Sequence, residues 1–180
     1  MPTGAEKLIT PRKPTLQELL ELREIAEFQF GVKGEYLIPS DILVVESPTT
    51  SRIRLIISEG KPYLSIRARD YRFNLHIAAG YVLNRVLPKP KLRVYVKDEY
   101  ASFVSMGKTL FCKHVLLADP GIRPDDEVLV LDGNGELVAV GRATKAGWEM
   151  VFHKRGEAVK IREGARSHHS AIYVPKPLTP

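Results

Sequence analysis

The spacing of apolar residues in the first part of the chain predicts a helix followed by strands. Residues 14–31 read PTLQELLELREIAEFQFG, in which Thr15 and Glu18 have the spacing of a capping box and Gly31 suits a left-handed C-cap. This pattern indicates a helix. Short runs rich in β-branched residues at 41–46, 52–58 and 62–68 predict strands, with a turn at 59–62.

Residues 75–87 (LHIAAGYVLNRVL) change to a helical period that ends at Pro88. Six apolar residues share one face of this predicted helix: Ala78, Ala79, Val82, Leu83, Val86 and Leu87. A helix, a small sheet and a second helix predict a compact α+β unit. The sequence PKPK at 88–91 is typical of a stiff connection. We therefore expect an N-terminal arm at 1–14, an α+β unit at 15–87, a linker at 88–91 and a second unit with a separate core.

The second half of the chain has mainly β patterning. Residues 92–97 (LRVYVK) alternate, which predicts that Leu92, Val94 and Val96 face one side and Arg93, Tyr95 and Lys97 the other. The elements expected after it are a short helix at 99–107, a strand at 110–117, a hairpin at 127–143, a short helix at 148–156 and a strand at 157–164. These short strands predict a small, nearly closed barrel over 92–165. The tail at 166–180 is either loosely ordered or a strand on the barrel edge.

The distribution of charged residues indicates a class of binding partner. The chain carries a formal net charge of +6, and between Arg52 and Lys97 eleven basic residues face only Glu59 and Asp70. Clustered charge of one sign repels itself in the folded state, so it favours a polyanionic partner, although a solvated sheet face is the alternative.

No run approaches the roughly 20 apolar residues of a membrane span, and 1–13 lacks the apolar core of a signal peptide. We expect a cytoplasmic protein without membrane contact.

Candidate catalytic and metal-binding residues are few. Cys112 is the only cysteine, which excludes an intramolecular disulfide and a multi-cysteine zinc site, so neither a metal nor a cofactor is expected. Cys112 and His114 would share a face of one strand, but a Cys-His nucleophile also needs an orienting group. The acidic residues at 125–127 suit a turn better than a magnesium site. His168 and His169 point in opposite directions on an extended chain and chelate poorly. We expect no catalytic residue.

Several stretches of the sequence resemble a known protein family. GKTLFCKHVLLADPGIRPDDEVLVLDGNGELVAVGRA at 107–143 and KRGEAVKIREGA at 154–165 resemble a PUA domain, the RNA-binding barrel named after pseudouridine synthases and archaeosine transglycosylases. LREIAEFQFG, RIRLI and PKLRVYV resemble the region before and at the PUA domain of archaeal tRNA-guanine transglycosylases, so the resemblance covers about 19–165. In that family, a zinc-containing barrel of about 250 residues exchanges the base. The present 180 residues leave no room for it.

The resemblance therefore implies RNA binding and not the exchange reaction. It also implies that the end of an RNA helix lies against the glycine-containing loop after the first helix of the PUA domain and its neighbouring strands. The matching positions are Gly107, Lys108, Phe111, Lys113, His114, Arg142 and Arg162. Lysine and arginine would contact phosphates, glycine allows close approach of the backbone, and core packing is the preferred interpretation of Phe111.

The partner expected from this resemblance is RNA. A tRNA is favoured, and rRNA, bound by a ribosome-assembly factor, is the alternative. A protein partner in RNA modification is a further candidate. A small enzyme that uses Cys112 and His114, or a protein-interaction module, remains open on the sequence alone.

Overall fold

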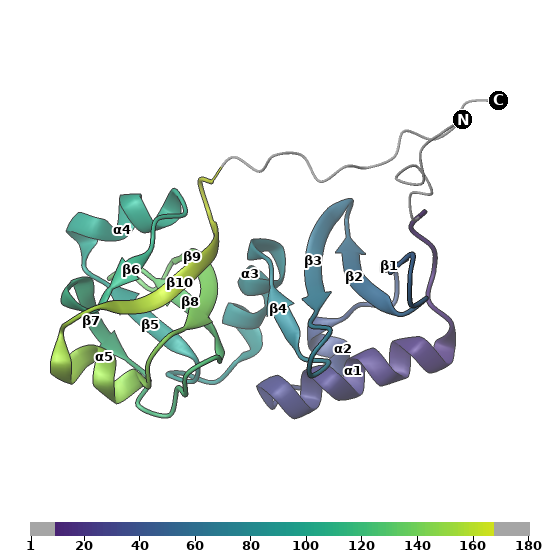
Figure 1. Ribbon diagram of the computed structural model, residues 1–180, viewed down its shortest axis with the longest axis horizontal. Coiled ribbons are helices and arrows are strands. Elements are labelled where there is room, and N and C mark those ends of the chain that lie inside the picture. The colour runs from purple at the N-terminus through teal and green to yellow at the C-terminus, as the bar shows by residue number, and fades with distance from the viewer. Residues whose placement is uncertain (1–9, 168–180) are drawn as a thin grey trace.

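The computed structural model describes residues 10–167, and its elements form two groups on either side of a short helix, α3 (Figure 1). The first group consists of α1 (Leu16–Phe30), α2 (Gly34–Leu37), β1 (Leu43–Glu46), β2 (Ile53–Ser58), β3 (Lys61–Ile66) and β4 (Phe73–Leu75). Its strands form an antiparallel sheet in the order β1-β2-β3-β4. Helix α3 spans Ile77–Val86.

The second group forms a six-stranded sheet. Its elements are β5 (Arg93–Val96), α4 (Asp98–Ser105), β6 (Leu110–Phe111), the 3-10 helix η1 (Cys112–His114), β7 (Val115–Ala118), β8 (Glu127–Leu131), β9 (Leu137–Ala143), α5 (Gly147–His153) and β10 (Glu157–Gly164). The strand order is β6-β10-β9-β8-β5-β7, and only the β5–β8 pair is parallel among these described strands. The sheet is nearly closed, which confirms the predicted α+β class with a pseudo-barrel.

The caps of α1 are those that the sequence predicts. The Thr15 hydroxyl accepts a hydrogen bond from the Glu18 amide at 3.1 Å, and the Glu18 carboxylate accepts one from the Thr15 amide at 2.8 Å. Gly31 adopts φ 70°, and its amide donates to the Glu27 carbonyl at 2.9 Å. Both ends of the helix thus have partners for backbone groups that the helix itself leaves unpaired.

The predicted strand at 110–117 is wrong in its middle. The chain makes a 3-10 turn at Cys112–His114 between β6 and β7. The turn is held by the Cys112 amide, which donates to the Gly156 carbonyl at 2.9 Å, and by the Val115 amide, which donates to the Cys112 carbonyl. Because of this turn, Cys112 is buried while His114 lies half-buried near the surface, so the two side chains do not share a strand face.

Arg93, which the alternation places on the face opposite Val94, is completely buried. Its guanidinium donates to the Asn84 side chain at 3.0 Å and to the backbone carbonyls of Asn84 and Leu87 at 2.8 and 2.9 Å. It also donates to the Pro88 carbonyl at 3.1 Å. These carbonyls belong to the end of α3 and the segment after it, which need donors. Arg93 therefore caps α3 from the first strand of the second sheet.

The buried apolar side chains of both groups form one contiguous cluster. The expected division into two units with separate cores stays a prediction. Helix α3 joins the two groups and packs on β9 without room for a side chain at Gly80. A Cβ atom there would lie 2.5 Å from Val140 Cγ1 and 3.0 Å from Leu137 Cδ2. The linker at 88–91 and the boundaries around it stay a prediction. Within 10–167, no helix is long and apolar enough to cross a membrane.

Candidate nucleic-acid interface

The loop after α4 depends on one glycine. Gly107 has φ 93°, a conformation that residues with a side chain rarely adopt. Its amide donates to the Val104 carbonyl at 2.9 Å, and the Lys108 amide donates to the Phe103 carbonyl at 3.2 Å. This turn ends α4 and leaves Lys108 exposed on the surface.

The 3-10 turn η1 brings Lys113 and His114 to the surface in different ways. Lys113 is exposed, whereas the His114 ring stacks on Tyr100 of α4 with an interplanar angle of 20°. Desolvation lowers the pKa of His114, and repulsion from Lys113 and Lys97 lowers it further. The imidazole is therefore neutral at pH 7, and the stacked pair is an aromatic surface beside exposed Lys113 and half-buried Lys97.

Large apolar side chains lie exposed on α4 and the loop after it. Phe103 and Met106 are exposed, and so is Phe111, at 41% of its surface. The prediction that Phe111 packs in the core is wrong, because the alternation of the short strand β6 buries Leu110 and turns Phe111 outward. Phe103 and Met106 were not predicted from the sequence as surface residues. Exposed aromatic side chains of this kind are able to stack on unpaired bases.

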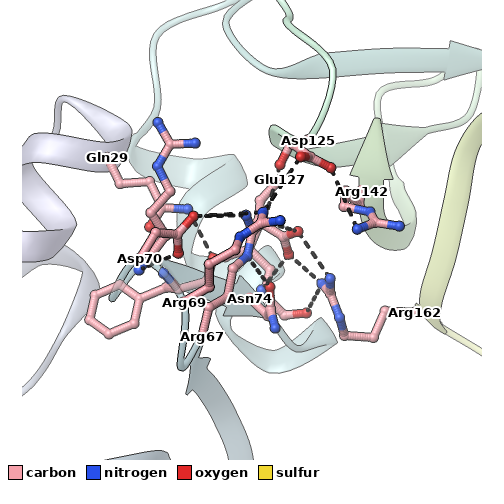
Figure 2. A network of polar contacts seen from close by, with 12 residues as sticks. Gln29, Arg67, Arg69, Asp70, Asn74, Asp125, Glu127, Arg142 and Arg162 are labelled. Carbon is pink, nitrogen blue, oxygen red and sulfur yellow. Dashed lines mark hydrogen bonds and ion pairs between the residues drawn. The ribbon is translucent and has the colours of Figure 1, made fainter. Parts of the chain in front are cut away.

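Arg142 and Arg162 lie in another place. They line an open cleft of about 570 Å³ between the two sheets (Figure 2). The complete lining is Arg67, Ala68, Arg69, Asn74, Arg142, Lys160, Ile161 and Arg162. None of the five predicted residues at 107–114 belongs to it. The structure therefore divides the predicted site into a loop surface, formed by Gly107, Lys108, Phe111, Lys113 and His114, and a basic cleft.

The basic cleft is organised by Glu127, whose side chain is fully buried at the start of β8. One carboxylate oxygen accepts from the Leu75 amide at 2.7 Å and from Arg162 Nη1. The other accepts from Arg67 Nη2 at 3.1 Å and Arg162 Nη2 at 3.0 Å. From the sequence, Glu127 was expected only where a turn enters a strand. An acidic residue in an otherwise apolar, fully buried strand was the signal for this role.

The alternative chemistry is not assembled in the part of the chain that the structure describes. Burial raises the pKa of the Cys112 thiol, and this thiol is enclosed in the core. Asp126 accepts from the Arg123 amide at 2.9 Å, and Asp125 has φ 73°, so both residues form a turn. Across 10–167, no group of three or more His, Cys, Asp or Glu side chains could hold a metal ion. His168 and His169 lie outside the described residues.

Comparison with known families identifies both parts of the chain. Residues 92–165 match the PUA domain, and residues 21–90 match the patch-forming domain C2 of tRNA-guanine transglycosylase. Residues 92–165 therefore form a PUA domain. The match assigns both the loop surface and strands β8 to β10 of the basic cleft to the PUA domain. The remaining wall of the cleft, which contains Arg67, Arg69 and Asn74, lies in the C2-like region.

The relatives of the PUA-domain protein include archaeal enzymes. It is 39% identical to the tRNA-guanine(15) transglycosylase of Pyrococcus abyssi over 161 residues, which cover 89% of this chain and 27% of that enzyme. It is 41% identical to the corresponding enzyme of Pyrococcus furiosus over 154 residues, 84% of this chain and 26% of the enzyme. The chain thus spans about a quarter of the length of these relatives and matches their C-terminal region.

Solved structures share the fold over most of the chain. A hypothetical protein from Pyrococcus horikoshii superposes with a TM-score of 0.67 at 22% identity, covering 89% of this chain and 96% of that one. A conserved PUA domain protein from Thermoplasma acidophilum superposes with a TM-score of 0.61 at 21% identity and the same coverage. The combination of a small α+β unit with a PUA domain is therefore a recurrent fold.

Proposed function

We propose that this PUA-domain protein binds structured RNA, with tRNA as the favoured ligand, and takes part in tRNA modification without catalysing a reaction itself. The observation that carries the proposal is the adjacent match to a PUA domain and to the C2 domain of tRNA-guanine transglycosylase. The relatives that share this combination are named for a reaction on tRNA. A tRNA ligand also implies that the protein works in the cytoplasm, with a modification enzyme as its candidate protein partner.

The loop surface is the proposed contact with RNA. Lys108 and Lys113 are exposed, and neither side chain has a hydrogen bond or ion pair among residues 10–167. Their ammonium groups are therefore available to phosphate oxygens, which are the most frequent protein contacts on nucleic acids. The backbone at Gly107 allows a close approach, and the exposed ring of Phe111 is suited to stack on an unpaired base.

The absence of catalysis is part of the proposal. It is supported by the burial of Cys112, because a thiol nucleophile must reach its substrate as a thiolate and burial raises the pKa of this thiol. His114 is stacked on Tyr100 and follows Cys112 in a tight turn rather than on a shared strand face. The match to the transglycosylases is limited to their PUA-type C-terminal part.

The loop surface can be tested by reversing its charge. We expect Lys108→Glu with Lys113→Glu to weaken binding of a tRNA transcript by about 2 kcal/mol, because two favourable contacts with phosphate become repulsive. Fluorescence anisotropy with a labelled tRNA measures this loss. Lys13→Glu with Lys33→Glu changes the net charge by the same amount at exposed positions of the first group and serves as the control.

Equal loss in the two double variants would mean that only net charge matters and that RNA is not held on the loop surface. The class of RNA is decided by crosslinking in cells followed by sequencing. Recovery of rRNA in place of tRNA would favour the ribosome-assembly alternative and overturn the tRNA assignment.

A further inference from the structure

We propose that the basic cleft is a second RNA contact, which holds the phosphodiester backbone of the same RNA that the loop surface binds. This inference rests on the proposed RNA binding and adds a site that lies between the PUA domain and the C2-like region. The cleft is open and has a volume of about 570 Å³, within the range of ordinary ligand sites.

Cationic side chains converge on the cleft from segments far apart in the sequence. Arg67 and Arg69 follow β3, Arg142 comes from β9, and Lys160 and Arg162 come from β10. Lys160 lies opposite Arg142 in the β9–β10 register. Figure 2 shows Arg142 and Arg162 on one side of the cleft and Arg67 and Arg69 on the other. Like charges repel, so bringing five of them together requires anionic partners.

Buried Glu127 holds two of these cations in place. Arg67 and Arg162 both donate to it, and their side chains are only 12% and 26% exposed. Arg67 also donates to Asn74 at 2.7 Å, and Arg162 donates to the Leu75 carbonyl at 3.1 Å. Their rotamers are thus fixed before any ligand arrives, which removes part of the entropy cost of binding.

The other three cations retain free donors. Arg142 and Arg69 lie 3.5 and 3.6 Å from opposite oxygens of Asp125, beyond close hydrogen bonds. The Lys160 side chain is exposed and has no ion pair or hydrogen bond among the described residues. Five cations and the three carboxylates that they contact, Asp70, Asp125 and Glu127, leave an excess of two positive charges. This excess matches two phosphodiester groups.

The lining favours the backbone of the RNA over its bases. Among residues 10–167, its only apolar members are Ala68 and Ile161, and none of the lining residues in this range has an aromatic ring that could stack on a base. Arginine guanidiniums bind phosphate oxygens through two parallel donors, and lysine binds as a point charge. The basic cleft would therefore hold RNA irrespective of its sequence and position it on the loop surface.

An affinity measurement tests this second contact. We expect Lys160→Glu to weaken tRNA binding about tenfold at 0.1 M salt, because it places a negative charge next to the bound phosphates. Lys13→Glu makes the same change in net charge at an exposed position of the first group and is the matched control. A milder variant, Arg142→Gln, should reduce the magnitude of the log–log salt slope by roughly 0.7 to 0.9 if it removes one phosphate contact.

A directed cleavage experiment tests the location. An iron chelate is attached to Lys160→Cys or, separately, to Lys108→Cys, each in a Cys112→Ser background, and hydroxyl radicals then cut the nearby RNA backbone. We expect the two probes to cut the same tRNA at two different segments.

The affinity and cleavage experiments together separate the second contact from RNA binding itself. Loss of affinity only in the loop variants, with no cuts from position 160, overturns the second contact and leaves RNA binding intact. Failure of the wild-type protein to bind tRNA or rRNA overturns both.

A small anion is the remaining occupant to be distinguished. Titration with inorganic phosphate, followed by NMR, detects binding of a free anion in the cleft. Phosphate binding that Lys160→Glu abolishes, combined with unchanged tRNA affinity in that variant, would show that the cleft takes a small anion and would overturn the proposal.

Discussion

At the scale of single residues, two buried charged side chains hold the molecule together. Arg93 and Glu127 both lie in strands of the second sheet, and both pair with groups from the first part of the chain. A buried charge is costly unless its hydrogen bonds are satisfied. Here each one satisfies backbone groups that would otherwise be unpaired, such as the carbonyls at the end of α3 and the Leu75 amide.

Replacement of Arg93 by methionine should lower the free energy of unfolding by about 3 kcal/mol, because it removes several charge-assisted hydrogen bonds and leaves the carbonyls of α3 without donors. Urea denaturation measures the change. Lysine should not restore stability, since one ammonium group cannot reach all the acceptors that the guanidinium serves. An unchanged midpoint in Arg93→Met would show that water replaces these donors at little cost. Arg155→Met, at an exposed position, is the control.

The ionisation of Glu18 predicts a pH effect. Hydrogen bonds from Arg12, and from the Thr15 amide and hydroxyl group, lower the pKa of Glu18 from 4.5 to about 2. Because the pKa in the folded state is the lower one, Glu18 stabilises the fold above pH 4.5, and this contribution is lost as the pH falls toward 2. The difference in stability between wild type and Glu18→Gln should therefore shrink between pH 5 and pH 2.5. A difference that is constant over this interval would contradict the assignment.

At the scale of elements, α3 is the joint between the two sheets. Its C-terminal end is capped by Arg93, and its middle packs on β9, where Gly80 leaves space for Val140 and Leu137. Glycine normally weakens a helix interior by close to 1 kcal/mol relative to alanine. At this position, the contact between helix and sheet requires the smallest residue, because any Cβ would overlap the side chain of Val140.

Substitution of Gly80 by valine should lower the free energy of unfolding by about 2 kcal/mol, since the added carbons overpack the contact with β9. Tyr81→Val introduces the same residue at an exposed position of the same helix and separates this effect from helix propensity. Thermal unfolding of the two variants measures the difference. Equal melting temperatures for both would mean that α3 and β9 move apart at little cost.

At the scale of the whole molecule, charge and shape act together. The net charge of +6 is not spread evenly, because residues 21–91 carry eleven basic and eight acidic residues, whereas residues 92–165 carry eleven of each. If Lys108, Lys113, Arg142 and Lys160 each neutralise one phosphate, the logarithm of tRNA affinity should fall with the logarithm of salt concentration with a slope of about −3. Anisotropy titrations between 50 and 200 mM salt measure this slope. Affinity that does not change with salt would contradict phosphate-based binding.

The sequence predicted features whose causes are local. The capping box at Thr15, the C-cap at Gly31 and the hairpin of β8 and β9 each depend on residues within a few positions of one another. It failed where tertiary contacts decide. Alternation indicates which face of the strand Arg93 occupies, but not that α3 buries this side chain and supplies its acceptors.

The same reason explains why only part of the candidate site could be predicted from the sequence. Lys108 and Lys113 could be proposed from a motif, but the basic cleft depends on Glu127, which bonds Arg67 from 60 positions away. Neither α2 nor β4 was predicted, because four and three residues are too short for a period to be recognised.

The contiguous cluster of buried apolar side chains has a consequence for the proposed binding of RNA. Because apolar side chains pack continuously from α1 to β10, the loop surface and the basic cleft cannot shift freely relative to each other. If RNA binds at both proposed surfaces, the distance between their phosphate contacts adds to any recognition of a base by Phe111. The protein would then favour an RNA in which two backbone segments are folded to the matching distance.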